Sequence, residues 1–340
     1  MEAFAASSGK KSGAMGNPET RTQAAVGPAQ GEGVQGGMEY DGLFWRRMAY
    51  RGAIVGPEIW KRVAPVVTGL VIFMLVKENR HGAVANFRRI LSDAAGGREP
   101  GAFATYRAAA RMFVEFSRVF AETSEVQQAD FSGADVDEVI DLELPPNLDL
   151  ENAFSGDKGV VVLTSHFGCW EIGARVMSRF ERPVNLVMAH EENPTVQAFQ
   201  DEMRHRHGLK VIHSDDSKFA SVEMLRALQR GEVVAIQLDR SAPGQVTREV
   251  SFFGKAAPFQ IGPFHLARAA GVPLWPVFTV RKSRRKYRLL PSKFYRIPRR
   301  ADDQALADVQ REVVALFESH VRHYPHQWFQ FHDFWANDPA

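Results

Sequence analysis

The residues with the clearest capacity for chemistry are a histidine and an acid five positions apart, His166 and Glu171, within the run SHFGCWE. A neutral imidazole can accept the proton of an alcohol or amine while that group attacks a carbonyl carbon. A carboxylate on the other ring nitrogen fixes the tautomer and stabilises the imidazolium that forms. His166 is therefore a candidate general base, and Glu171 is its candidate orienting partner.

These two side chains can meet only if the backbone changes conformation between them. In a continuous helix, five residues turn a side chain by about 500°, which would place Glu171 roughly 140° away from His166. The preceding residues 160–164 (VVVLT) form a mostly β-branched run that is typical of a strand buried on both faces. We expect His166 to lie in the turn after this strand and Glu171 in the first turns of the next helix. Open α/β sheets bind ligands at such strand ends, and Gly168 would leave room for a substrate.

The spacing does not identify a catalytic pair by itself. With 11 His and 40 acidic residues in the chain, a pair at this spacing is expected by chance. A histidine that only caps a strand-to-helix turn is the alternative interpretation. The strand before His166 and the rest of the chain must therefore support the interpretation.

Two other groups of residues could do chemistry. Cys169 could act as a thiol nucleophile, but a helix would direct it away from the turn that holds His166. His320, His323 and His326 have a three-residue spacing that could bind a metal ion. Pro325 interrupts the helix there, so we expect a solvated or otherwise satisfied helix terminus.

Downstream of His166 the chain alternates between short apolar runs and helical patterns. The runs that indicate further strands are 185–189, 209–212, 233–238 and 274–280. The patterns that indicate helices are 194–208, 217–230, 261–270 and 302–323. This alternation predicts an α/β fold with a mostly parallel sheet and helices on both faces.

The part before this fold divides into two regions. Residues 1–37 are rich in Gly, Ala, Ser and Gln, so we expect a disordered tail. Residues 38–125 are expected to be helical and to contact a membrane, and 126–340 to form the α/β domain. The run 63–76 has fourteen uncharged residues between basic flanks, which is short for a bilayer span of about 20 residues. A buried core helix and a segment that dips into one leaflet both remain open.

A basic tract follows the last predicted strand. Residues 281–300 contain ten Lys or Arg and no acid, with aromatic and aliphatic residues between them. This composition fits an anionic membrane surface or an acidic carrier protein, and a basic hairpin without a partner is the alternative. No nucleic-acid motif accompanies the tract, so we do not expect nucleic acid as a partner.

The net charge says little about function, whereas the cysteine content indicates the cellular compartment. The formal net charge is only +2, so the distribution of charge is more informative than its sum. The single cysteine excludes an intramolecular disulfide and a cysteine-based zinc site, and it favours a reducing compartment. The first residues lack the apolar run of a secretory signal, so we expect the cytoplasmic side of a membrane.

The run SHFGCWEIG after a hydrophobic strand resembles the His-x4-Asp/Glu motif of the lysophospholipid acyltransferase superfamily. The chain is most similar to the branch of lipid A late (lauroyl and myristoyl) acyltransferases and phosphatidylinositol mannoside acyltransferases. Further similar blocks follow in the same order, namely QLDR at 237–240, VSFFGKAA at 250–257, GP at 262–263, residues 266–273 and QWFQFH at 327–332. Ser241 stands where the mannoside enzymes usually carry Asp, and the lipid A enzymes commonly lack the Arg of this block.

The resemblance implies direct acyl transfer from acyl carrier protein or coenzyme A to a hydroxyl or amine of a lipid. His166 would be the general base and Glu171 its partner, and the chemistry needs no metal or cofactor. The residues expected to bind substrate are Arg240, Arg281, Arg204, Gly168 and Asp239. A solvated or salt-bridged surface position is the alternative for each of these arginines.

The acceptor is left open by the resemblance. A lipid A-like glycolipid at the inner face of a bacterial cytoplasmic membrane is the leading expectation. A phospholipid, an aminolipid or a specialised-metabolite alcohol would be acylated by the same chemistry. The alternative from another functional class is a non-catalytic protein that keeps the fold and only binds membranes.

Overall fold

The computed structural model describes residues 52, 55–128, 139–142, 144, 145, 148, 150, 154, 156–177, 182–190, 194–206, 208–215, 219–240 and 245–336. The tail expected at 1–37 lies outside the described residues.

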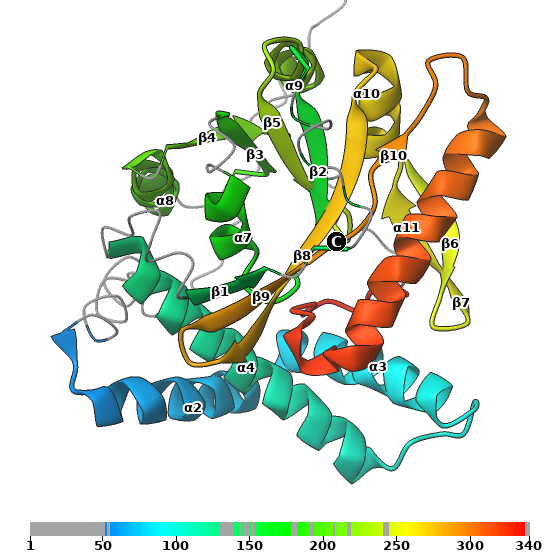
Figure 1. The fold of residues 1–340 in the computed structure, drawn as a ribbon. Helices are drawn as coiled ribbons and strands as arrows, with labels where there is room; N and C mark the ends of the chain where they lie inside the picture. The colour runs from blue at the N-terminus through cyan, green and yellow to red at the C-terminus, as the bar shows by residue number, and fades with distance from the viewer. Residues whose placement is uncertain are drawn as a thin grey trace, which may run out of the picture. The chain divides into compact units, whose positions relative to one another are not determined.

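A mixed sheet organises the α/β part, with the strand order β1-β9-β8-β2-β5-β3-β4 (Figure 1). Its central strands run parallel to one another: β8 (Pro273–Ser283), β2 (Val160–Thr164), β5 (Val233–Gln237), β3 (Val184–Met188) and β4 (Leu209–His213). Strands β9 (Lys286–Pro291) and β10 (Tyr295–Arg296) are antiparallel to β8, and β1 (Ile140–Leu142) is parallel to β9. The mostly parallel sheet expected from the sequence is confirmed.

Helices pack on both faces of this sheet, as the alternation of strand side chains requires. In β2, Val161 and Leu163 belong to one hydrophobic cluster, whereas Val160 and Val162 belong to another. The first cluster is completed by side chains of α9 (Ala220–Gln229), α10 (Gly262–Ala270) and α11 (Asp303–His323). The second includes side chains of α3 (Lys77–Ala94), α4 (Ala102–Gln128) and α7 (Trp170–Met177). Helix α8 (Pro194–Arg206) connects β3 to β4, and the short η3 (Pro325–Gln327) follows α11.

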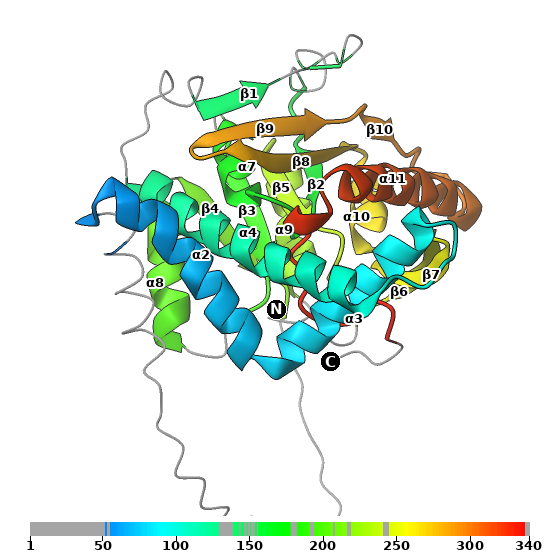
Figure 2. The same ribbon diagram turned by 90° about the horizontal axis from the view of Figure 1, so that it is seen from below.

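Helix α2 (Glu58–Leu75) precedes α3 and α4, and it is not a buried core helix. Its buried residues are Pro65 and Gly69, while most of its large apolar side chains are exposed. A Cβ on Gly69 would lie 2.7 Å from the carbonyl oxygen of Phe113, so glycine permits the close contact with α4. Figure 2 shows α2 and α4 side by side.

Within the described part of the chain, no single helix has the length and apolar character to cross a bilayer. Helices α2 and α3 pass that test only as a pair, and the chain bends by 97° between them. Helix α4 ends close to the boundary expected at 125, and α3 and α4 share a hydrophobic core with the sheet.

A second, two-stranded sheet was not expected from the sequence. Strands β6 (Thr247–Phe252) and β7 (Lys255–Gln260) pair antiparallel through a two-residue turn at Phe253 and Gly254, both with positive φ. Turns of this kind favour Asn or Asp before Gly, so the Phe-Gly pair carries no usual hairpin signal. The strained Phe253 is held by long-range contacts, because Arg89 donates to its carbonyl oxygen at 2.7 Å and Glu318 accepts from its N–H at 2.7 Å.

A buried ionic network joins α4 to the sheet. Arg281 of β8 donates to the carboxylate of Glu122, with Nη2 2.7 Å from Oε1 and Nε 3.0 Å from the same oxygen. Tyr287 of β9 donates its hydroxyl to Oε2 of Glu122 at 2.9 Å, and burial raises the pKa of this tyrosine, so it remains a donor. The side chains of Arg281 and Glu122 are only 13% and 7% exposed.

We predict that Glu122→Ala lowers the free energy of unfolding by about 3 kcal/mol, because it leaves the buried Arg281 with only the longer contact to Glu115, at 3.5 Å. The matched control is Glu312→Ala, which breaks the exposed pair with Lys293 at 2.9 Å and should cost no more than about 1 kcal/mol. Urea denaturation of both variants measures the difference. Equal small losses would contradict a structural role for the Glu122 network.

Candidate active site

The local geometry around His166 follows the expectation from the sequence. Strand β2 ends at Thr164 and helix α7 begins at Trp170, so His166 lies in the connecting turn and Glu171 in the first turn of the helix. The turn is at the carboxyl end of a parallel strand in the centre of the sheet.

The carboxylate at the ring of His166 belongs to Asp239. Thr164 of β2 pairs with Gln237 of β5, so the residues two positions beyond these strands face each other. Nδ1 of His166 lies 3.0 Å from Oδ1 of Asp239, and the backbone N–H of His166 donates to the same carboxylate at 3.0 and 3.1 Å. The pair therefore depends on the register of β2 against β5.

Glu171 does not occupy the position that was expected for it. Its Oε1 lies 3.4 Å from Nη2 of Arg204 on α8, while the Nδ1 of His166 is held by Asp239. The expected pairing of His166 with Glu171 is therefore corrected to a pairing with Asp239, because the strand register brings Asp239 to the ring. Asp239 was expected among the substrate-binding residues, and its position in the QLDR block after a predicted strand was the available signal.

The electrostatics of the pair favour a neutral imidazole. Burial lowers the pKa of His166 below its ordinary value of 6.5, and the charge of Arg240 acts in the same direction, although Asp239 opposes both. Burial alone would raise the pKa of Asp239, but its interactions with His166 hold it below the ordinary value of 3.8. Asp239 is thus ionised and accepts from Nδ1–H, which leaves Nε2 of His166 as the nitrogen able to take a proton. The side chain of His166 is 20% exposed and that of Asp239 is 0% exposed.

The C-terminal aromatic block fixes this pair in place. The indole N–H of Trp328 donates to Oδ2 of Asp239 at 3.0 Å, and the backbone N–H of Phe329 donates to the carbonyl oxygen of His166 at 2.8 Å. The side-chain amide of Gln330 donates to the carbonyl oxygen of Asp239 at 3.3 Å. The block was recognised in the sequence, but its contacts with the histidine and the aspartate were not foreseen.

Glycine is required at position 168 for a different reason from the one expected. Its φ is +56°, and a Cβ there would lie 2.0 Å from the carbonyl oxygen of Thr279 in β8. The space is therefore filled by the neighbouring strand rather than left for a substrate. The glycine allows the turn to lie against β8, where the N–H of Cys169 donates to the same oxygen at 3.1 Å.

The arginines expected to bind substrate differ in their availability. The guanidinium of Arg281 is engaged with Glu122, and that of Arg204 lies among Glu171, Gln200 and Asp201 with a side chain 8% exposed. Arg240 is exposed, directly follows Asp239 and donates from Nη2 to the carbonyl oxygen of Phe329 at 3.3 Å. Of the three, Arg240 is the arginine best available to an anionic ligand beside His166.

The remaining candidates, Cys169 and the three histidines near the end of α11, do not form a catalytic or metal site. Cys169 is buried, and burial raises the pKa of its thiol well above the ordinary value. His323 lies with Nδ1 2.7 Å from the carbonyl oxygen of Ser319, and His326 stacks on Phe87. These histidines face separate neighbours, so their spacing does not bring them to a common ligand point.

The sequence as a whole matches the model of one protein family, described as bacterial lipid A biosynthesis acyltransferase, over residues 52–337. No curated protein matches the chain. Among solved structures, the chain is similar to the 1-acyl-sn-glycerophosphate (LPA) acyltransferase PlsC from Thermotoga maritima, with 16% identity and a TM-score of 0.35. That likeness covers 74% of this chain and 99% of PlsC. Because the family model spans most of the chain, the protein belongs to the bacterial lipid A biosynthesis acyltransferase family and is an acyltransferase.

Proposed function

We propose that the protein transfers a fatty acyl group from acyl carrier protein or coenzyme A to a hydroxyl, or an amine, of a membrane glycolipid. A lipid A-like acceptor is favoured because the matching family is named for lipid A biosynthesis. The observation that carries the proposal is the His166–Asp239 pair, in which Nδ1 is engaged and Nε2 remains for a substrate.

The pair supports a direct transfer. Nε2 of His166 takes the proton of the acceptor hydroxyl while its oxygen attacks the thioester carbonyl. The C–S bond of the tetrahedral intermediate then breaks, and the imidazolium returns the proton to the leaving sulfur. Asp239 is a positioning residue, because it holds the tautomer and stabilises the imidazolium through Nδ1–H.

Arg240 is proposed to bind a phosphate of the acceptor or of the donor. It is exposed, it is adjacent in sequence to Asp239, and its Nη2 is near the backbone of Phe329, which itself bonds His166. A guanidinium can bind phosphate oxygens in a bidentate manner. Arg281 and Arg204 are not included, since their guanidinium groups are engaged with carboxylates.

We predict that His166→Ala lowers the rate of acyl transfer by about 10²–10⁴-fold, because it removes the general base. Asp239→Asn should lower kcat to a similar extent, since an amide cannot stabilise the imidazolium. Glu171→Gln should reduce the rate less than Asp239→Asn, because Asp239 holds Nδ1 of His166 whereas Oε1 of Glu171 accepts from Arg204. The measurement is the initial rate with acyl carrier protein and coenzyme A thioesters and a glycolipid acceptor.

The matched control is Cys169→Ser, which alters a buried thiol in the same turn and should keep most of the activity. Circular dichroism shows whether each variant is folded. A folded His166→Ala variant with near wild-type activity would refute the base. A larger loss in Glu171→Gln than in Asp239→Asn would return Glu171 to the role that the sequence suggested.

A pH profile tests the electrostatics. Because only neutral His166 can act as a base and its pKa is lowered, kcat/KM should fall on the acid side with a midpoint below pH 6.5. Arg240→Gln removes a positive charge that lowers this pKa, so the midpoint should move to higher pH. Arg311→Gln, an exposed arginine on α11, is the control and should leave the midpoint unchanged. A shift of the midpoint to lower pH in Arg240→Gln would contradict the assignment of the acid side of the profile to His166.

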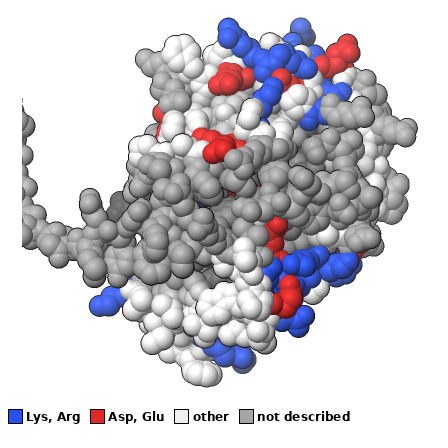
Figure 3. All heavy atoms as spheres, turned by 90° about the vertical axis from the view of Figure 1, so that its left-hand side faces the viewer, with Lys and Arg blue, Asp and Glu red and all other residues white. Residues whose placement is uncertain are grey.

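We also propose that helix α2 contacts the inner face of a bacterial cytoplasmic membrane. The exposed apolar side chains of this helix and of the residue after it are Ile59, Trp60, Val63, Val67, Leu70, Val71, Met74, Leu75 and Val76. Figure 3 shows mostly uncharged atoms on the lower part of the side where α2 lies in Figure 1. Exposed apolar patches of this kind mark interaction or membrane sites.

The basic tract 281–300 supports this contact less than its composition suggested. At least six of its ten cations pair with acids of other elements: Arg281 with Glu122, Lys282 and Arg288 with Asp141, Arg284 and Arg285 with Glu125, and Lys293 with Glu312. Membrane binding is therefore proposed to depend mainly on the apolar face of α2.

We predict that the double variant Met74→Glu, Leu75→Glu lowers binding to anionic vesicles by about tenfold or more, since each apolar side chain contributes up to 1.5–3 kcal/mol when fully buried. The control is Phe219→Glu, which changes an apolar side chain, 77% exposed, at the start of α9. Vesicle sedimentation at low and high salt measures both. Loss of all wild-type binding at high salt would show that charge, rather than α2, provides the contact.

A further inference from the structure

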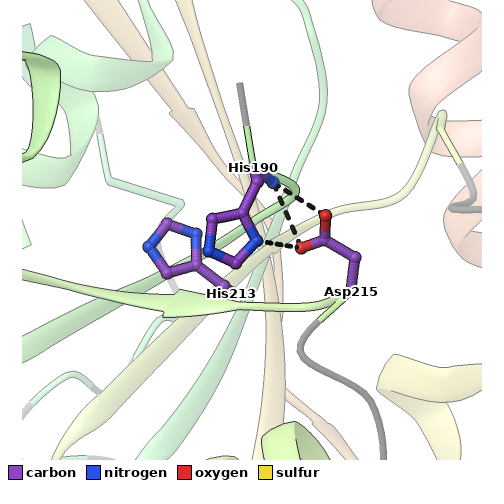
Figure 4. Close-up of side chains that lie close together, drawn as sticks. All are labelled: His190, His213 and Asp215. Carbon is purple, nitrogen blue, oxygen red and sulfur yellow. Dashed lines mark hydrogen bonds and ion pairs between the residues drawn. The ribbon is translucent and has the colours of Figure 1, made fainter. Parts of the chain in front are cut away.

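A second histidine–aspartate pair lies at the carboxyl ends of β3 and β4. Met188 of β3 pairs with His213 of β4, and the residues two positions beyond them are His190 and Asp215. Nδ1 of His190 lies 2.9 Å from Oδ1 of Asp215, and its backbone N–H donates to the same carboxylate at 3.1 Å (Figure 4). This arrangement repeats the geometry of His166 and Asp239 on the adjacent pair of strands.

The second pair differs from the first in two respects. The side chains of His190 and Asp215 are each 38% exposed, whereas Asp239 is fully buried. The imidazole of His213 also stacks on that of His190, with ring centroids 3.8 Å apart and planes 15° from parallel (Figure 4). The second pair therefore has a third side chain beside it, His213, which can bind a metal ion.

Ligand-type atoms of His190, His213 and Asp215 lie within 4.8 Å of one another. Two imidazoles and a carboxylate form a ligand set that Zn²⁺ uses, with bonds of about 2.0–2.2 Å and therefore about 3.4 Å between tetrahedral ligands. The Nδ1 of His190 and the Oδ1 of Asp215 are already near that spacing, at 2.9 Å. A zinc ion could replace the proton that these two atoms share.

The orientation of His213 supports a metal ligand. Its Nδ1 is buried and has no hydrogen-bond partner in the described part of the chain, whereas its Nε2 lies 3.5 Å from Oδ2 of Asp201 on α8. Metal-binding histidines commonly place a carboxylate on the ring nitrogen opposite the metal. Asp201 is in that position, and the unpartnered Nδ1 is left for the ion. A buried imidazole nitrogen without a partner is otherwise an unfavourable feature.

We propose that His190, His213 and Asp215 bind one Zn²⁺ ion, with Asp201 as the outer carboxylate of His213. Three protein ligands leave one tetrahedral position for water or for an anionic oxygen ligand. The site is separate from the His166–Asp239 pair, and the proposal does not depend on the acceptor or donor of the acyl transfer. Binding needs the ligand atoms, which lie within 4.8 Å of one another, to close by at most about 1.4 Å to reach the tetrahedral spacing of about 3.4 Å.

The test uses the full chain without an affinity tag, stripped with a chelator and dialysed. Calorimetric titration with zinc sulfate should give one ion per chain. His190→Gln and Asp215→Asn should each weaken binding by at least 100-fold, and Asp201→Asn by about 10–100-fold as an outer-shell change. Co²⁺ in place of Zn²⁺ should give the visible absorption of a four-coordinate ion in the wild type and in the control variants, and His190→Gln and Asp215→Asn should lose it.

The matched controls are His323→Gln and Asp308→Asn on α11, which should leave the affinity unchanged. His190 is exposed, so His190→Gln is expected to fold, and far-ultraviolet circular dichroism checks this. Absence of stoichiometric zinc binding by the wild type overturns the proposal, as does equal weakening in the control variants. Binding is measured without acyl transfer, so an inactive enzyme would still support or refute the zinc site.

Discussion

The side-chain carboxylate of Asp239 has no exposed surface, and a buried charge is strongly unfavourable unless hydrogen-bond donors surround it. Its donors are the backbone and ring N–H groups of His166 and the indole N–H of Trp328. These residues lie in the turn after β2 and in the C-terminal block, while Asp239 follows β5. The hydrogen bonds that this one carboxylate requires therefore connect three distant parts of the sequence at the candidate active site.

The same requirement explains the local backbone. His166 can direct both its main-chain and ring nitrogens to Asp239 only in a turn, and Gly168 lets that turn lie against β8. The second pair, His190 and Asp215, uses the same relation between neighbouring parallel strands. Parallel strands in register thus generate such pairs two residues beyond their ends, and the surroundings determine what each can do. The buried first pair has a lowered histidine pKa suited to a base, whereas the exposed second pair has another histidine beside it.

Much of the fold could be predicted from the sequence, because local patterns carry it. The apolar run at 160–164 and the helical pattern at 302–323 correspond closely to β2 and α11. The partner of His166 could not be derived in this way, since it depends on β5 lying next to β2 although β3 and β4 come between them in the chain. Sequence proximity favoured Glu171, and strand order favours Asp239. The hairpin of β6 and β7 was missed because its turn residue, Phe253, is held by contacts with Arg89 and Glu318.

The composition of the basic tract 281–300 overstated how much unpaired positive charge this surface carries. Its cations look unpaired in the sequence because their acidic partners, such as Glu122, Glu125 and Asp141, are about 140–160 residues away. In the folded chain these pairs attach α4 and β1 to the edge of the sheet formed by β8 and β9. Charge that is already neutralised attracts anionic lipids weakly, since the attraction depends on net local potential. The exposed apolar side chains of α2 are therefore the stronger basis for the proposed membrane contact. If apolar contact holds such an enzyme on the membrane, its substrate site stays near the lipid at any ionic strength, because salt screens only the electrostatic attraction.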